Sequence, residues 1–149
     1  MTLLRRLDHV AVLVRNTEEA LRFYEGHLGL RRHSSEVISE PHVRLTYLDT
    51  GNAYLQLIEP LDPGSSLGTW LDERGEGLHH ICFGVDDVEG AVTALSDSGA
   101  EVTLGAGRGR QSSFVTTNGS HGVRVECTQF VYDEDVGQVS GWLDGRQSG

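Results

Sequence analysis

LDHVAVLVRNTEEALRFY, residues 7–24, recurs 71 positions later as LHHICFGVDDVEGAVTAL, residues 78–95. The two copies align without a gap, so that His9 meets His80 and Glu18 meets Glu89. A repeat of this length indicates that one supersecondary unit occurs twice and that its copies share a core. This repeat decides the fold, because it divides the chain into two similar modules.

Each copy predicts a strand followed by a helix. Apolar residues first alternate with other residues, as in a strand with one buried face. A helix start is then marked by Asn16 with Glu19, and by Asp86 with Glu89, which have the spacing of an N-cap and an acidic third residue. Helical spacing places one apolar face on the strands, formed by Leu21, Tyr24 and Leu28 in the first copy and by Val88, Ala91, Val92 and Leu95 in the second.

Further strand-like segments follow each helix and complete a βαβββ module. They are HVRLTYLDT (42–50) and AYLQLIEP (53–60) in the first copy, and EVTL (101–104), SSFVTT (112–117) and VRVECTQF (123–130) in the second. We expect an α+β fold with module one at 5–61, a linker carrying a short helix at 62–76, module two at 77–130 and a tail at 131–149. The tail is expected to be disordered or to dock through Trp142 and Leu143.

The composition excludes several classes of function. A net charge of −10 opposes a broad phosphate-binding surface, so we expect no nucleic-acid partner. All 12 basic residues are Arg, which excludes a Schiff-base lysine. No apolar run reaches the roughly 18 residues that cross a bilayer, and the N-terminus lacks a signal-peptide pattern. We therefore expect a cytoplasmic protein with no membrane partner.

Four polar residues occupy equivalent positions in the two copies. His9 and His80 begin the repeats, and Gln56 and Glu126, which lie 70 positions apart, stand on the last strand of each module. Each of these residues taken singly is more often a surface or core residue. Together, two imidazoles, a carboxylate and an amide oxygen suit one divalent ion, such as Co²⁺, Mn²⁺, Zn²⁺ or Ni²⁺, with positions left open for substrate. His79 has no equivalent and is given no role.

The motifs DHVAV, LQLIEP, GLHHICFGV and HGVRVE resemble those of the vicinal oxygen chelate superfamily, which contains glyoxalases, bleomycin resistance proteins and dioxygenases. The resemblance covers about residues 5–130 and is strongest to the methylmalonyl-CoA epimerases. It implies a cupped mixed sheet around a metal ion, usually within a homodimer. Carried over to this chain, the metal ligands are His9, Gln56, His80 and Glu126.

The same resemblance implies a metal-dependent epimerase that removes a proton alpha to a thioester or carboxylate carbonyl. Glu40, in SEPHV where the epimerases read EEQGV, is the candidate base, and Pro41 and His42 replace the family's Gln and Gly. Glu126 is the candidate for the second acid/base group, on the opposite side of the substrate. Arg108 and Arg110, in the Gly-rich GAGRGRQSS, are expected to receive the phosphates of an acyl-CoA from a loop.

Two alternatives stay open at this point. His9, His80 and Glu126 alone form the 2-His-1-carboxylate set of Fe(II) oxygenases, so an extradiol-type dioxygenase of the same fold is the second hypothesis. The third is a metal-free protein that binds small molecules and confers resistance. Retention of all four polar residues argues against the third hypothesis.

Overall fold

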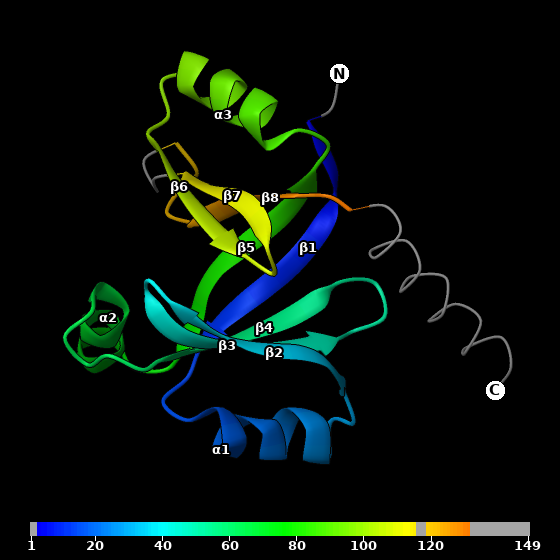
Figure 1. Ribbon diagram of the computed structural model, residues 1–149, viewed down its shortest axis with the longest axis vertical. Helices are drawn as coiled ribbons and strands as arrows, with labels where there is room; N and C mark the ends of the chain where they lie inside the picture. Colours follow the sequence, from blue (N-terminus) through cyan, green and yellow to red (C-terminus); the bar gives the residue numbers. More distant parts are fainter. Residues whose placement is uncertain (1–2, 116–118, 132–149) are drawn as a thin grey trace, which may run out of the picture. The chain divides into compact units, whose positions relative to one another are not determined.

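The computed structural model describes residues 3–115 and 119–131. Its first half contains β1 (Leu4–Leu13), α1 (Thr17–Leu21), a π-helical segment η1 (Arg22–His27), β2 (Arg31–Ser39), β3 (His42–Asp49) and β4 (Tyr54–Pro60). After α2 (Ser66–Arg74), the second half contains β5 (Gly77–Val85), α3 (Val88–Asp97), β6 (Val102–Gly107), β7 (Arg110–Val115) and β8 (Val125–Gln129) (Figure 1). The predicted α+β class with two tandem βαβββ modules is confirmed.

The described chain divides into two compact units. The N-terminal unit contains Val10–Thr50 and Tyr54–His79, and the C-terminal unit contains residues 3–9, 51–53 and those from His80 onward. β1 and β5 therefore contribute residues to both units. As a consequence, His9 and His80, which begin the two repeats, belong to the same unit.

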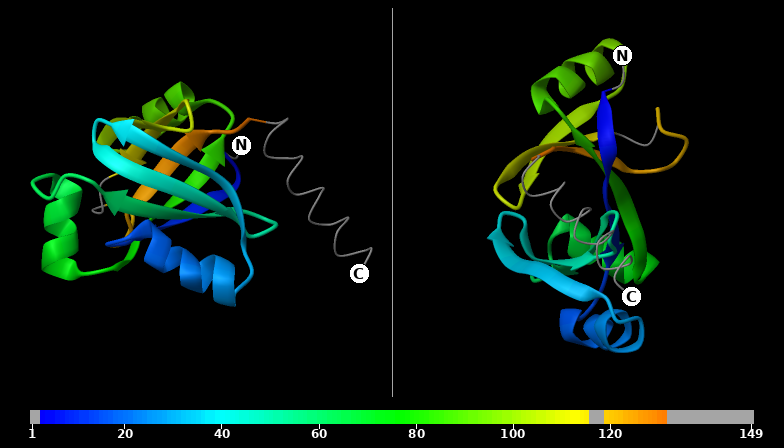
Figure 2. Two further views of the ribbon diagram at one scale, coloured as in Figure 1. Left: turned by 60° about the horizontal axis from the view of Figure 1, so that its bottom comes forward. Right: turned by 90° about the vertical axis from the view of Figure 1, so that its right-hand side faces the viewer.

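In the N-terminal unit the strands follow the order β2-β3-β4-β1, and β3 is antiparallel to both β2 and β4 (Figure 2). Alternating side chains give this sheet two apolar faces. One face packs on α1 through Val14, Leu21, Leu48 and Leu57. The other packs on α2 through Ala11, Leu13, Val43, Leu45, Tyr47, Tyr54, Ile58 and Leu71.

The C-terminal unit has the strand order β5-β8-β7-β6, with β5 and β8 parallel and the remaining neighbours antiparallel. Val88 and Ala91 of α3 pack on Val85 and Cys127, so the helix covers one face of β5 and β8. Successive side chains of a strand point to opposite faces. Glu126 consequently faces away from α3.

Two details of the helices differ from the predictions. Asn16 caps α1 by accepting from the Glu19 amide at 3.0 Å, as expected, but Asp87 rather than Asp86 caps α3. Leu28 is 57% exposed instead of packing on the strands. The chain there takes a π turn, in which the Leu28 amide donates to the carbonyl of Phe23, and the wider turn moves Leu28 off the apolar face.

Two further segments differ from the expected pattern. β2 was absent from the predicted strands, because most of its side chains are exposed and show no apolar alternation. GAGRGRQSS is a β-hairpin rather than a loop, since β6 and β7 are joined by the two-residue turn Arg108–Gly109. The expectations about the tail and about Trp142 and Leu143 lie outside the described residues. No helix in the described part of the chain is both long and apolar enough to cross a membrane.

Candidate metal site

Three buried side chains from three strands of the C-terminal unit meet at one point. His9 comes from β1, His80 from β5 and Glu126 from β8. Nε2 of His9 lies 3.1 Å from Nε2 of His80, and Glu126 Oε1 lies 3.2 Å from each of these nitrogens. The strand order brings the three together, because β8 pairs directly with β5 and places Glu126 beside Cys82. We call these three residues the trio.

The trio has the spacing of ligands that share one metal ion. Nitrogen and oxygen ligands bind divalent ions at about 2.1 Å, so two such ligands at right angles lie about 3.0 Å apart. The measured separations of 3.1 and 3.2 Å agree with this value. Imidazole and carboxylate ligands suit Zn²⁺, Co²⁺, Ni²⁺, Mn²⁺ and Fe²⁺, and a set of three leaves positions for further ligands. The residues present therefore fit a divalent ion.

Asp8 orients the imidazole of His9 for metal binding. The Asp8 carboxylate is fully buried, and its Oδ2 lies 2.7 Å from Nδ1 of His9. In the neutral imidazole that binds a metal, the carboxylate accepts a hydrogen bond from Nδ1–H, which leaves the lone pair on Nε2 available to the ion. Arg108 lies on the other side of the carboxylate, with Nη2 2.5 Å from Asp8 Oδ2.

The charges of the site hold its acids ionised. Burial alone would raise the pKa of Glu126, but hydrogen bonds from His80 and His9 outweigh it and lower that pKa far below the usual range. Burial also opposes ionisation of Asp8, whose pKa is nevertheless lowered by His9, Arg108 and Arg110. Both carboxylates are therefore anionic at neutral pH, as ligation and orientation of a metal ligand require.

The two imidazoles differ in their proton affinity. Burial would lower the pKa of His9, but its hydrogen bonds to Asp8 and Glu126 raise it instead. For His80, burial dominates and the pKa is lowered, despite the contact with Glu126. Burial likewise raises the pKa of the nearby Cys82 thiol well above its usual range, which disfavours the thiolate that a metal would bind. Oxygen and imidazole ligands remain the favoured set.

Gln56 lies in the N-terminal unit, on β4, with 4% of its surface exposed. Its Nε2 donates to the Tyr47 hydroxyl at 2.7 Å. Its Oε1 is buried and has no hydrogen-bond partner among the described residues. A buried amide oxygen without a partner is unfavourable by about 1–3 kcal/mol, and a metal ion would satisfy it. Ligation of the same ion as the trio remains a prediction.

The remaining predicted site residues lie as follows. Glu40 is exposed at the turn between β2 and β3, in the N-terminal unit. The side chains of Arg108 and Arg110 are 9% and 6% exposed and face Asp8, with Arg110 Nη1 4.0 Å from Asp8 Oδ1. In this arrangement both guanidinium groups face a buried carboxylate instead of solvent. Their binding of acyl-CoA phosphates stays a prediction.

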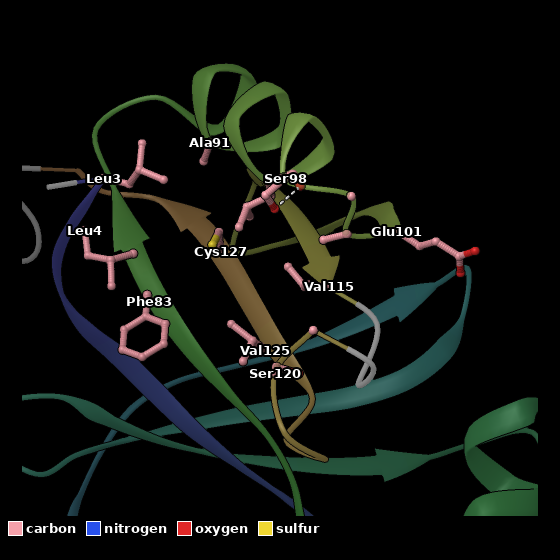
Figure 3. Close-up of a pocket in the computed structure, with 14 residues that line it drawn as sticks. Leu3, Leu4, Phe83, Ala91, Ser98, Glu101, Val115, Ser120, Val125 and Cys127 are labelled. Atoms are coloured by element: carbon pink, nitrogen blue, oxygen red, sulfur yellow. Dashed lines mark hydrogen bonds between the residues drawn. The ribbon is translucent and has the colours of Figure 1, made fainter. Parts of the chain in front are cut away.

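A pocket of about 840 Å³ lies on the other face of the C-terminal unit, beneath α3 (Figure 3). Val125 and Cys127 of β8 line it, together with Ala91 and Leu95 of α3. Because side chains alternate along β8, Glu126 points away from this pocket. His9, His80 and Glu126 do not line this pocket.

Residues 8–129 match the family described as the Glyoxalase/Bleomycin resistance protein/Dioxygenase superfamily. The chain belongs to this superfamily. The mitochondrial methylmalonyl-CoA epimerase of Homo sapiens is 33% identical over 132 residues, which cover 85% of this chain and 74% of that protein. The ethylmalonyl-CoA/methylmalonyl-CoA epimerase of Cereibacter sphaeroides is 30% identical over 131 residues, 83% of this chain and 97% of that protein.

Solved structures of methylmalonyl-CoA epimerases are also similar to this chain. A variant of the Streptomyces coelicolor methylmalonyl-CoA epimerase, in complex with 2-nitronate-propionyl-CoA, has a TM-score of 0.79 and 33% identity; the match covers 85% of this chain and 97% of that one. Together with the relatives, this similarity confirms the predicted membership of the glyoxalase superfamily and the resemblance to its epimerases.

The role of Asp8 beside His9 was not predicted from the sequence. Its counterpart in the second copy is His79, so the repeat gave no sign of a shared role. A signal was nevertheless present, because Asp8 is a charged residue within an apolar strand and directly precedes a predicted ligand. Charged residues are almost never fully buried without a partner.

Proposed function

We propose that this protein is a metal-dependent epimerase that inverts the carbon alpha to the carbonyl of an acyl-CoA thioester, with methylmalonyl-CoA or a close analogue as substrate. The observation that carries the proposal is the trio, in which two imidazole nitrogens and one carboxylate oxygen lie 3.1–3.2 Å apart and buried. Support also comes from the relatives, which are epimerases of methylmalonyl-CoA and ethylmalonyl-CoA.

His9, His80 and Glu126 would hold the ion, with Gln56 as the fourth ligand. A bound divalent ion supplies Lewis-acid stabilisation of the negative charge that develops on the carbonyl oxygen when the alpha proton leaves. Burial of the trio excludes water, which strengthens this electrostatic stabilisation. The identity of the ion is left open among Co²⁺, Mn²⁺, Zn²⁺ and Ni²⁺.

Inversion requires a proton to be removed from one face of the carbon and another to be returned to the opposite face. In the proposal, Glu40 and Glu126 act as the two acid/base groups. Glu126 is anionic at neutral pH, which is the ionisation state that a base requires. For each epimer, the ionised carboxylate would take up the alpha proton, and the other carboxylate, entering the step protonated, would return a proton to the opposite face.

The two-base assignment is tested by exchange of the alpha hydrogen with D₂O, followed separately for the 2R and 2S substrates. We expect the wild type to exchange both, and Glu40→Gln to lose the fast exchange of one epimer. Glu73→Gln, an exposed carboxylate on α2, is the matched control and should behave as the wild type. Equal exchange of both epimers by Glu40→Gln would contradict the role of Glu40.

A second candidate function has one specific observation in its favour. The trio alone is a 2-His-1-carboxylate set, the usual ligand set of non-haem Fe(II) oxygenases. Oxygen uptake by Fe(II)-loaded protein in the presence of catechols would support this dioxygenase function and contradict the epimerase. A homodimer is proposed for either function, and sedimentation equilibrium at micromolar concentration tests it.

A further inference from the structure

A buried ion pair lies next to the trio, and the proposed reaction does not use it. Asp8 is 0% exposed, and the Arg108 side chain that contacts it is 9% exposed. Burying such a pair is seldom more stabilising than burying apolar residues of similar volume, because both groups lose their hydration. Stability of the fold alone is therefore a weak reason for the pair.

The pair joins the hairpin between β6 and β7 to a metal ligand. Asp8 Oδ2 accepts hydrogen bonds from His9 Nδ1 at 2.7 Å and from Arg108 Nη2 at 2.5 Å. Arg110 approaches the other carboxylate oxygen and also donates to the Gln129 carbonyl at 3.3 Å. One carboxylate thus connects an imidazole to the hairpin turn, and its position depends on the arginine.

The backbone at Arg108 makes this contact unusual. Arg108 has a φ of +54°, and the following Gly109 has a φ of +69°. Two-residue turns with both central residues at positive φ favour Asn, Asp or Gly at the first position. A residue with a long side chain is disfavoured in this left-handed region, because its Cβ approaches the following carbonyl oxygen. Burying the Arg side chain also removes much of its rotamer freedom, which is unfavourable.

Strained residues of this kind occur where the surrounding structure needs the side chain in one place. From this conformation the Arg108 guanidinium reaches the buried Asp8 carboxylate. We infer that Asp8 and Arg108 are a positioning pair, in which Arg108 fixes the Asp8 carboxylate and the carboxylate holds His9 with Nε2 directed at the metal. The inference rests on one part of the proposed function, which is that the trio binds a divalent ion.

The positioning pair should control metal affinity more than folding. Replacing the outer hydrogen-bond partner of a metal-binding histidine weakens metal binding by roughly 10- to 100-fold. We expect this loss for Asp8→Asn, which keeps the shape of the side chain and removes its charge. Arg108→Asn should lose less, about 3- to 10-fold, because the carboxylate remains but is no longer fixed. Arg108→Lys, which keeps the charge, should recover part of the loss.

The Arg108→Asn variant separates positioning from structure. Asn is favoured at this position of the turn, so the hairpin backbone is relieved while the contact with Asp8 is lost. A merely structural role for Arg108 predicts metal affinity that follows the free energy of unfolding. The positioning role predicts weaker metal binding in a variant whose β6–β7 turn remains intact.

The experiment measures the dissociation constant of Co²⁺ by competition with a chromophoric chelator, and the visible absorption bands of the bound Co²⁺, in metal-stripped full-length protein. Urea unfolding of each metal-free variant is measured alongside. Asp86→Asn and Arg5→Gln are the matched controls, because these residues form an exposed ion pair at 3.2 Å in the same unit. Both controls should bind Co²⁺ within twofold of the wild type.

The outcomes are distinguishable. The inference holds if the wild type binds Co²⁺, Asp8→Asn binds it at least tenfold more weakly with altered absorption bands, and Arg108→Asn binds it about 3- to 10-fold more weakly. If the wild type binds Co²⁺ and both Asp8→Asn and Arg108→Asn bind it within twofold, the inference fails while the proposed function stands. A wild type that binds no divalent ion contradicts the proposed function and the inference together. Should Asp8→Asn not fold, the two Arg108 variants decide the question.

Discussion

His79 and His80 are adjacent in sequence and are expected to respond oppositely to replacement by alanine. His80 supplies Nε2 to the trio, 3.2 Å from Glu126 Oε1, and its ring contacts Phe114 edge-on at 5.2 Å. His79 instead packs edge-on against Trp70 of α2, with ring centroids 4.9 Å apart. The pair is a matched test, because the residue type and the replacement are the same.

His80→Ala should abolish tight metal binding. Changing only an outer partner of a metal ligand weakens binding by roughly 10- to 100-fold, so removal of the ligand itself should exceed about 100-fold, or about 2.8 kcal/mol. The losses in the metal-free protein include the hydrogen bond to Glu126 and the edge-on ring contacts with Phe114 and His9, about 2–4 kcal/mol of unfolding free energy. Glu126 keeps His9 as a partner, so the variant should still fold.

His79→Ala should lose the contact with Trp70 and leave the trio in place. An aromatic pair contributes about 0.5–1.5 kcal/mol, and we expect a decrease of that size in unfolding free energy with metal affinity unchanged within twofold. Zn²⁺ or Co²⁺ competition with a chelator measures affinity, and urea unfolding with near-ultraviolet circular dichroism verifies the fold. The account is refuted if His80→Ala retains affinity within threefold, or if His79→Ala loses as much as His80→Ala.

Three further outcomes are expected. In metal-free protein, the lowered pKa of Glu126 means that its stabilisation is complete above the unfolded value near 4.5 and is lost as pH falls below it. Urea unfolding at pH 5, 4 and 3 should therefore show a steeper loss, by up to about 1.4 kcal/mol per pH unit below the unfolded value, in wild type than in Glu126→Gln. Gln56→Leu should bind metal at least tenfold more weakly while losing only about 1 kcal/mol of stability, because the hydrogen bond that Gln56 makes within the described residues is the one to Tyr47. Unchanged metal affinity would exclude Gln56 as a ligand. Gly68→Ala should lower stability by about 1–3 kcal/mol without changing metal affinity, because a Cβ there would lie 2.6 Å from the Pro63 carbonyl oxygen; a melting temperature equal to wild type would contradict this packing.

The fold and the trio could be predicted because both depend on the repeat. The strand–helix pattern recurs with one period, and equivalent polar positions mark His9, His80 and Glu126 without any knowledge of distances. The structure adds that the three side chains are buried and that their nitrogen and oxygen atoms lie 3.1–3.2 Å apart. Gln56 follows from the same register, although the structure describes it only within its own unit.

The features that sequence reasoning missed depend on local backbone geometry or on unrepeated contacts. Leu28 is exposed because a π turn replaces an α-helical one, a change that apolar spacing does not reveal. Arg108 was expected in a loop, since glycines surround it, whereas those glycines permit a tight hairpin turn. Asp8 was missed because its repeat counterpart is His79, which does not share its role.

The central claim is that this chain performs metal-dependent proton transfer at the alpha carbon of an acyl-CoA. The most direct measurement follows deuterium incorporation into methylmalonyl-CoA in D₂O before and after removal of divalent ions with a chelator, and again after their return. The account predicts exchange that stops on removal and recovers with Co²⁺ or another divalent ion. Exchange that continues undiminished in metal-stripped protein, or that is absent with every ion supplied, would contradict it.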